Sequence, residues 1–252
     1  TLDDPVWAGL VNGVDQSLDY RVETDAWSSP TYHVEVFELP RVDRIDATLK
    51  FPDYVNEAPR HIVDTTRVSA PEGTEVTWTC QLNHAVETAV LLAADGSPVP
   101  LVPNADDATI VSASLTPTET TRYRIRLTDP AGRDNESPPQ VTVRIVRNLP
   151  PRLKPDPPGD VTVSPLQELT VSATVRDDFG LTRAGVTTSL QGGPPEETVL
   201  TENVDAKQSV QLRHQIDFES LRAEPDQLLT YFFWTEDLGP EGTVRRHDGD
   251  LY

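Results

Sequence analysis

Acidic side chains at the ends of two expected strands are the residues here whose types and spacing suggest a ligand site. Asp177 and Asp178 end one strand, and Asp237, which follows Glu236, ends another. In a β-sandwich both strands can end at the same pole, and hard cations such as Ca²⁺ bind clusters of oxygen ligands. The sequence therefore predicts a calcium site at Asp177, Asp178 and Asp237. The alternative is that each closing Asp caps a turn with its own side chain.

No catalytic residue and no cofactor-binding residue is predicted. The five His residues do not show the spacings typical of zinc sites, and no nucleophile elbow, phosphate loop or dinucleotide fingerprint occurs. Carboxylate pairs are frequent because 41 residues are acidic, so they do not by themselves indicate a glycosidase site. The chain is expected not to be an enzyme; the rival hypothesis is an acidic active site in an unrecognised cleft.

The single cysteine, Cys80, lies in the alternating segment Val76-Thr-Trp-Thr-Cys80-Gln-Leu82. In antibody-like domains a Cys at this place pairs with one that lies two residues after a conserved Tyr. Ile125 occupies that position here, so Cys80 is predicted to be buried and unpaired. Trp78 falls on the same strand face and is predicted to anchor the core.

The elements that must position these residues are β-strands. Three segments begin with a Tyr, continue with apolar or small residues at every second position, and close with an Asp; they start at Tyr20, Tyr123 and Tyr231. Alternation with a period of two indicates strands with one buried face. Recurrence at about 100 residues indicates tandem domains of immunoglobulin size. The predicted fold class is all-β, with tandem immunoglobulin-like β-sandwich domains in an elongated arrangement.

Three domains are expected along the chain. Residues 1–43 resemble the C-terminal strands of an incomplete Ig-like domain, because a two-stranded unit alone is marginally stable. Residues 44–148 and 149–252 each show short strands with regular turn signals, and the last strand of the third domain is expected to be truncated. The boundary is Asn148-Leu-Pro-Pro-Arg, in which two prolines stiffen a short linker.

The charge balance restricts the classes of partner. The formal net charge is −20, and such a surface repels nucleic acid and anionic lipid, which need clustered Lys or Arg. The basic residues are almost all Arg, and because they are spread along the chain we interpret them as coding bias. No run of 18 apolar residues occurs. Trp7, Trp27 and Trp234 are the candidates for exposed aromatics; Trp27, in a hairpin turn, would meet a partner or sugar, or lie over its own domain edge.

Six segments carry a resemblance to a known family: Tyr20-Arg-Val-Glu-Thr-Asp, Ser28-Ser-Pro-Thr-Tyr-His-Val-Glu-Val, Phe51-Pro-Asp-Tyr54, Glu72-Gly-Thr-Glu-Val, Asp177-Asp-Phe-Gly-Leu and Asp250-Leu-Tyr252. With these residues the chain resembles a bacterial envelope family of planctomycete-type organisms that carries tandem Ig-like modules and is known as a domain of unknown function. The resemblance implies an exported protein of the periplasm or cell surface, with any membrane anchor outside these residues.

The expected function is that of a non-enzymatic structural, adhesion or assembly module in a larger cell-envelope protein. Its expected partner is another protein or a further copy of itself, and not nucleic acid. The alternative is a carbohydrate-binding or substrate-positioning module of a larger secreted enzyme. Coplanar exposed aromatics would favour that alternative, and the aromatic content of 6% argues against it. Calcium is the one cofactor that the residues suggest.

Overall fold

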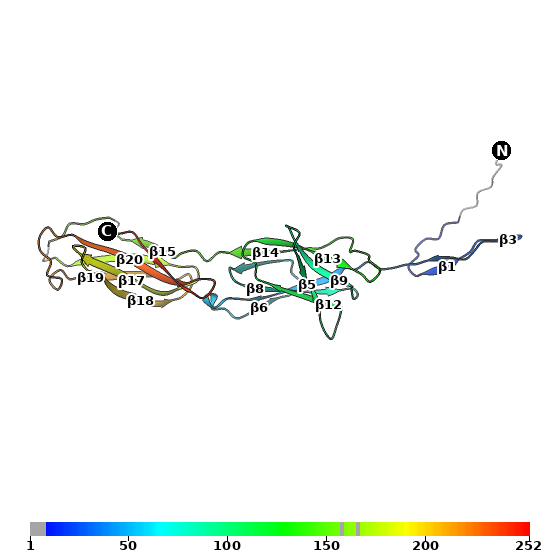
Figure 1. Cartoon of the computed structure of the whole chain (residues 1–252), viewed down its shortest axis with the longest axis horizontal. Coiled ribbons are helices and arrows are strands. Elements are labelled where there is room, and N and C mark those ends of the chain that lie inside the picture. Colours follow the sequence, from blue (N-terminus) through cyan, green and yellow to red (C-terminus); the bar gives the residue numbers. More distant parts are fainter. Residues whose placement is uncertain (1–8, 157–158, 165–166) are drawn as a thin grey trace, which may run out of the picture.

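The computed structural model describes residues 9–156, 159–164 and 167–252. This part of the chain consists of β-strands and one short 3-10 helix, η1 (Asp53–Val55). Figure 1 shows an N-terminal ribbon, a central sandwich and a second sandwich in line along the longest axis. The expected all-β sandwich fold class is confirmed, whereas assignment to the immunoglobulin-like class stays a prediction.

The N-terminal ribbon is a long hairpin. β1 (Leu18–Tyr20) pairs with β4 (Tyr32–Val34), and β2 (Glu23–Thr24) pairs with β3 (Trp27–Ser28) at its tip. Leu18, Tyr20, Tyr32 and Val34 share one face because they are directly opposed in the register. The rings of Tyr20 and Tyr32 stack with centroids 5.3 Å apart, and both remain about half exposed.

The first sandwich contains two five-stranded sheets. One sheet has the order β10 (Pro98–Pro100), β9 (Thr88–Ala93), β13 (Thr121–Thr128), β14 (Gln140–Val146), β7 (Arg67–Pro71). The other has the order β11 (Val102–Pro103), β12 (Ile110–Leu115), β8 (Glu75–Leu82), β5 (Val42–Lys50), β6 (Arg60–Ile62). All pairs are antiparallel except β14 with β7, which run parallel.

Alternation along the strands builds the core of the first sandwich. On β8 the side chains of Val76, Trp78, Cys80 and Leu82 all point inward and are buried. β13 contributes Tyr123, Ile125 and Leu127 to the same cluster in the same way. The predictions for Trp78 and Cys80 are confirmed, since both are fully buried and Cys80 is a free thiol. Burial raises the pKa of Cys80 to about 12, so the thiol is inert at neutral pH.

The second sandwich has its own core. One sheet has the order β15 (Arg152–Pro155), β16 (Leu169–Arg176), β19 (Ser209–Ile216). The other has the order β18 (Glu196–Val204), β17 (Leu181–Leu190), β20 (Leu229–Leu238), β21 (Val244–Asp248). The buried cluster between these sheets is separate from that of the first sandwich.

Trp234 differs from the expectation that named it a candidate for exposure, because only 1% of it is accessible. It lies opposite Gly185 of β17, where an added Cβ would come within 2.6 Å of the indole ring. The guanidinium of Arg246 lies 4.6 Å above the ring. Gly185 and Arg246 together enclose Trp234 on the outer side of its sheet, which sequence alternation alone could not show. Trp7 lies outside the described residues.

Several strands were not expected from the sequence. β18 is an edge strand whose residues are mostly polar, so its period-two signal is weak. β15 begins directly after the two linker prolines and pairs with β16. Asp217-Phe-Glu-Ser-Leu-Arg222 is predicted from the sequence to form one helical turn capped by an acid, and the structure has such a turn: the backbone N–H of Leu221 donates to the carbonyl oxygen of Asp217 at 3.3 Å. The Asp217 side chain caps this turn by accepting hydrogen bonds from the backbone N–H groups of Glu219 and Ser220.

Candidate functional site at the junction of the two sandwiches

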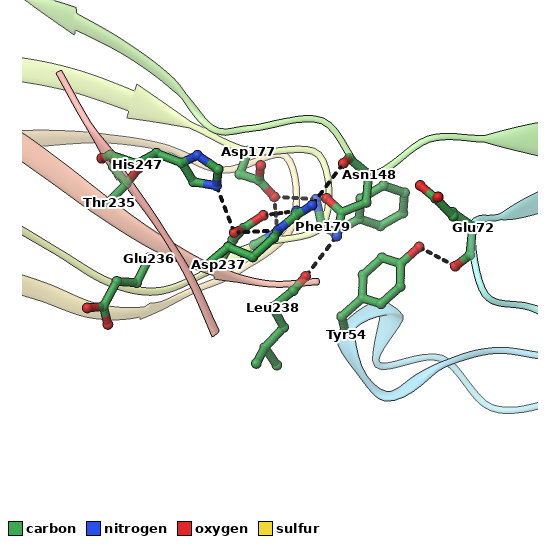
Figure 2. Close-up of polar contacts among 12 residues, drawn as sticks. Tyr54, Glu72, Asn148, Asp177, Phe179, Thr235, Glu236, Asp237, Leu238 and His247 are labelled. Atoms are coloured by element: carbon green, nitrogen blue, oxygen red, sulfur yellow. Dashed lines mark hydrogen bonds and ion pairs between the residues drawn. The ribbon is translucent and has the colours of Figure 1, made fainter. Parts of the chain in front are cut away.

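Polar and aromatic side chains gather where the first sandwich meets the second, and we call this region the junction (Figure 2). η1 supplies Tyr54 from the first sandwich, and the linker between β14 and β15 supplies Asn148. The turn between β16 and β17 supplies Phe179, and the β20–β21 hairpin supplies Leu238 and Arg245. Three elements distant in sequence therefore converge on a short linker.

An aromatic contact joins the two sandwiches. The ring of Tyr54 meets that of Phe179 edge-on, with centroids 5.0 Å apart and planes at 83°, a geometry that favours the ring quadrupoles. The Tyr54 hydroxyl donates a 2.7 Å hydrogen bond to the carbonyl oxygen of Glu72, so the polar end of the ring is also satisfied. Burial raises the pKa of Tyr54 to about 12, which keeps the phenol protonated as a donor.

Asp177 shapes the turn that carries Phe179. Its Oδ1 accepts hydrogen bonds from the backbone N–H groups of Phe179 and Gly180, each 2.8 Å long. Burial raises the pKa of Asp177, against these two donors, and the nearby carboxylates of Asp237 and Asp178 raise it further. Asp177 is therefore a turn-capping residue, as the alternative interpretation of the sequence expected.

Asp237 is the most buried carboxylate of the junction, with 1% of the residue accessible. Arg245 donates to both of its oxygens, from Nε at 3.2 Å and from Nη2. His247 Nε2 lies 3.1 Å from Oδ1. The hydrogen bond to Asp237 raises the pKa of Arg245. A buried carboxylate is thus neutralised by a forked guanidinium, the geometry in which such a pair is strongest.

Arg245 and Asn148 connect this ion pair to the linker. Arg245 Nη1 donates a 3.4 Å hydrogen bond to the carbonyl oxygen of Asn148. The Asn148 side-chain amide donates a 2.8 Å bond to the carbonyl oxygen of Leu238. Asn148 is itself buried. The linker is therefore held by the second sandwich through both its backbone and a side chain (Figure 2).

The turn between β7 and β8 touches the second sandwich as well. Gly73 has a φ of +81°, and a Cβ added there would lie 3.2 Å from the carbonyl oxygen of Pro240. Glycine suits this position for two reasons, because the backbone is left-handed and the neighbouring hairpin is close. Together with the aromatic contact, this gives the first sandwich two separate points of contact with the second.

The three predicted calcium ligands are not arranged as a metal site. Asp177 caps its own turn, Asp237 is paired with Arg245, and Asp178 is exposed. Among residues 9–156, 159–164 and 167–252, no group of three or more His, Cys, Asp or Glu side chains is placed to hold a metal ion. Calcium binding at these carboxylates stays a prediction that the structure does not support.

Sequence reasoning missed the residues that surround those carboxylates. Tyr54 was named only as part of the resemblance, and nothing in its spacing indicates a partner as distant along the chain as Phe179. The sequence analysis did not distinguish Arg245 from the other Arg residues. The available signal was its place on the strand that follows Asp237, since facing strands of a hairpin bring such residues together.

A cavity of about 480 Å³ lies at the other end of the second sandwich. Its described lining is mostly apolar and includes Phe218, Tyr231 and Tyr252, together with three carboxylates, those of Asp160, Glu224 and Asp226. None of the described lining residues is a His, Cys, Ser, Lys or Arg. The described lining therefore offers no cation for an anionic substrate, and its ionisable groups are carboxylates and phenols.

Trp27 is the expected candidate aromatic that is exposed, with 59% of the residue accessible at the tip of the N-terminal ribbon. Within the described residues, no helix is long and apolar enough to span a bilayer.

Comparisons with known proteins place the chain in no established family. No protein-family model matches it. No curated protein matches it either.

Several solved structures match this chain at low similarity. A DUF4785 family protein from Legionella pneumophila is 11% identical, with 73% of this chain and 54% of that chain covered and a TM-score of 0.28. Rst D1-D2 is 12% identical, with 84% of this chain and 97% of that chain covered and a TM-score of 0.31. The human OSCAR ligand-binding domain is 18% identical, with 75% of this chain and 93% of that chain covered and a TM-score of 0.26.

With TM-scores of 0.26 to 0.31, these structural neighbours carry no argument about the family of this chain. This chain spans about half of the Legionella protein, with 54% covered. Nothing in the comparisons supports a planctomycete-type origin, and at these scores the likeness carries no argument about function.

Proposed function

We propose that this chain is a non-enzymatic spacer, made of tandem Ig-like domains, in a larger exported protein of the bacterial cell envelope. It would hold other domains, or a protein partner, at a fixed distance and orientation in the periplasm or at the cell surface. The observation that carries this proposal is the junction, where the linker is bound by the second sandwich and an aromatic contact joins the two sandwiches.

The contacts of the junction support a stiff connection. A free linker between domains permits motion by default. Here the Tyr54–Phe179 contact resists bending of one sandwich over the other, and the bonds of Asn148 resist rotation about the linker. The net charge of −20 adds repulsion against a folded-back arrangement at low salt. A spacer requires these properties, and a catalyst would require a reactive cleft instead.

Small-angle scattering tests the extended shape. A compact globule of this length would have a radius of gyration of about 18 Å. We expect more than about 25 Å for sandwiches joined end to end across a stiff linker. A value close to that of the globule would overturn the spacer function.

Distance measurements between spin labels test the stiffness. Labels at Ser114→Cys and Gln211→Cys report on one exposed strand position in each sandwich, while the buried Cys80 stays unlabelled. We expect a narrow distance distribution that broadens in Phe179→Ala. The control Tyr32→Ala removes a ring of the N-terminal ribbon and should leave the distribution unchanged. A broad distribution in the parent protein would contradict a spacer with fixed orientation.

The carbohydrate-binding alternative has one observation in its favour. Tyr20 and Tyr32 form an exposed stacked pair on the ribbon, and Trp27 is exposed at its tip. Exposed aromatic faces are the surfaces on which sugar rings pack. The test is affinity electrophoresis in gels that contain soluble xylan, pullulan or peptidoglycan fragments. Retardation of the parent protein that is lost in Trp27→Ala would support this function. No retardation in any gel would exclude it for these sugars.

A further inference from the structure

Five arginines gather on the outer face of the β10-β9-β13-β14-β7 sheet. On β13 the exposed side chains of Arg122, Arg124 and Arg126 alternate with the buried core residues of that strand. Arg144 on β14 and Arg67 on β7 are exposed on the same side, because the register places each outside the inward-facing valines of its strand. We call these five residues the arginine face. Arginines that are spread along the sequence are thus brought together by the sheet.

The arginine face lacks counter-charges. No strand of this sheet contains an Asp or a Glu, although 41 residues of the chain are acidic. In the described part of the chain, none of the five guanidinium groups forms an ion pair or side-chain hydrogen bond. The opposite sheet behaves differently, since Arg44 pairs with Asp46 at 3.0 Å and Lys50 with Glu75 at 3.7 Å.

Unpaired like charges at this spacing are unfavourable for the isolated protein. Alternate residues of a strand lie about 6.8 Å apart, and neighbouring strands about 4.8 Å apart. Like charges on adjacent strands destabilise a sheet. A ligand that supplies negative charge would relieve this repulsion, and planar carboxylates match the forked donors of Arg in pairs.

The rest of this sheet face favours a protein as the source of those carboxylates. Val90 and Leu92 of β9 point outward beside the arginines and are half-buried, and Pro98 and Pro100 of β10 adjoin them. Arg next to apolar side chains is typical of protein interfaces. No aromatic residue occupies an outward position of these strands, so bases have nothing to stack on.

We propose that the arginine face is a docking surface for an acidic segment of a partner protein, bound in extended conformation. Glu or Asp at every second residue of such a segment repeats at about 6.8 Å, the same interval as the arginines along β13. This inference does not rest on the spacer function, because it needs only the first sandwich and not a stiff junction.

The experiment measures binding of a fluorescent peptide in which Glu alternates with Thr, by anisotropy at low ionic strength. The test variant replaces Arg122, Arg124 and Arg126 together by Gln. Exposed ion pairs are individually weak, so the loss of three should raise Kd about tenfold. Added salt should weaken binding to the parent protein. The thermal transition of the first sandwich should be retained in the variant, because all three side chains are exposed.

The matched control replaces Arg152, Arg176 and Arg213 by Gln. These exposed residues lie on the β15-β16-β19 sheet of the second sandwich, and their removal gives the same net charge as the test variant. The control should bind the peptide as the parent does. An equal loss of peptide affinity in both variants would show that binding depends on net charge alone, and would overturn the site. No measurable binding by the parent would overturn it as well.

Two further probes decide the class of partner. Oligo-dT and phosphatidylglycerol vesicles present phosphates instead of carboxylates. Tighter binding of either probe than of the peptide, at equal charge concentration, would assign the arginine face to nucleic acid or membrane and overturn the proposal. If the parent protein self-associates and the variant at Arg122, Arg124 and Arg126 does not, the arginine face binds a second copy of this chain. That result would overturn the proposal of a separate partner.

Discussion

The Asp that closes the penultimate strand has a different role in each of the two sandwiches. In the first, Asp129 at the end of β13 accepts bonds from the backbone N–H groups of Ala131 and Arg133, at 2.9 and 2.8 Å, and from Arg133 Nε at 2.7 Å. All these partners are within its own hairpin. In the second, Asp237 is bound by Arg245 and His247 from the following strand. Both Asp residues thus form an ion pair with an Arg of their own hairpin. Asp129 also closes a tight turn through backbone N–H groups, whereas Asp237 is also contacted by His247.

The two Arg partners nevertheless have a common feature. Arg133 lies 4.0 Å from the ring of Phe37, which belongs to the segment entering the first sandwich. Arg245 donates to the carbonyl oxygen of Asn148, in the segment entering the second. Phe37 is 51% exposed, whereas Asn148 is buried. The same Asp–Arg pair therefore touches the incoming linker in both sandwiches, and only the second encloses that linker. We infer that the second connection is the stiffer one.

The largest effect is expected from Trp78→Ala. The indole is fully buried in the first core, so its removal should lower the free energy of unfolding by about 3–5 kcal/mol through cavity formation. Because the two cores are separate clusters, calorimetry should show one transition moving and the other staying. If both transitions shift together, the sandwiches unfold as one unit and the comparison between them fails.

A smaller effect is expected from Asp237→Asn. The change leaves Arg245 and His247 without their carboxylate, and breaking a buried pair in this way costs about 3 kcal/mol. The second transition should fall in a thermal scan, and the distance distribution across the junction should broaden. The comparison variant Asp129→Asn should affect the first transition alone. If the distance distribution across the junction also broadens in Asp129→Asn, the proposed difference between the two carboxylates is wrong.

The pH dependence should differ in sign between Asp129 and Asp177. The backbone N–H of Arg133 holds the pKa of Asp129 below its ordinary value, so its contribution to stability is present above that value and is lost as pH falls through the lowered pKa. Burial raises the pKa of Asp177, so its contribution is present below its ordinary value of 3.8 and is lost as pH rises through the raised pKa.

Asp177→Asn tests this sign. The amide oxygen can still accept from Phe179 and Gly180, and the buried charge is removed. At neutral pH we expect the midpoint temperature of the second transition to equal that of the parent or to rise slightly. The midpoint should also depend less on pH than in the parent, in the acidic range around and above the ordinary pKa of Asp. The measurement is a series of thermal scans across this range. A clear drop at neutral pH would show that the charge of Asp177 stabilises the turn.

The fold was predictable where one strand face is buried and the other is solvated. β8 and β14 are strands of this kind, because their apolar residues alternate without interruption. Edge strands such as β18 were missed because polar residues occupy most of their positions. The arginines were first interpreted as coding bias, although Arg122, Arg124 and Arg126 alternate within one strand that lacks acids. Alternation of charge was as informative there as alternation of apolar residues.

The candidate site was predictable only in part. The closing Asp residues were found, and the turn-capping role of Asp177 was one of the two interpretations. The partners of these carboxylates depend on which strands face each other and on how the sandwiches meet. That information lies in the pairing of Asp237 with Arg245 and in the approach of Tyr54 to Phe179. The first follows from the sequence only once the two strands are paired as a hairpin, and the second cannot be inferred from residue type or from spacing along the chain.

The smallest expected effect is that of calcium. A cation at Asp237 must displace Arg245, which already neutralises the carboxylate, so we expect weak binding. With free Ca²⁺ equal to Kd, a ligand of the native state adds about 0.4 kcal/mol, which corresponds to a rise of about 2 °C for a domain of this size. Calorimetric scans with millimolar Ca²⁺ and with chelator measure the difference.

Arg245→Gln makes the same experiment sharper. Without the guanidinium, Asp237 would be free to join Asp177 and Asp178 as an oxygen ligand, and the rise with Ca²⁺ should exceed that of the parent. The matched variant Arg133→Gln frees Asp129 in the first sandwich, where no second acid was predicted as a ligand, and should show no such rise. If neither variant responds to Ca²⁺, the carboxylates at both strand ends are turn formers and ion-pair partners alone. If both respond equally, the effect is one of surface charge, and the distinction between the two Asp positions does not extend to cations.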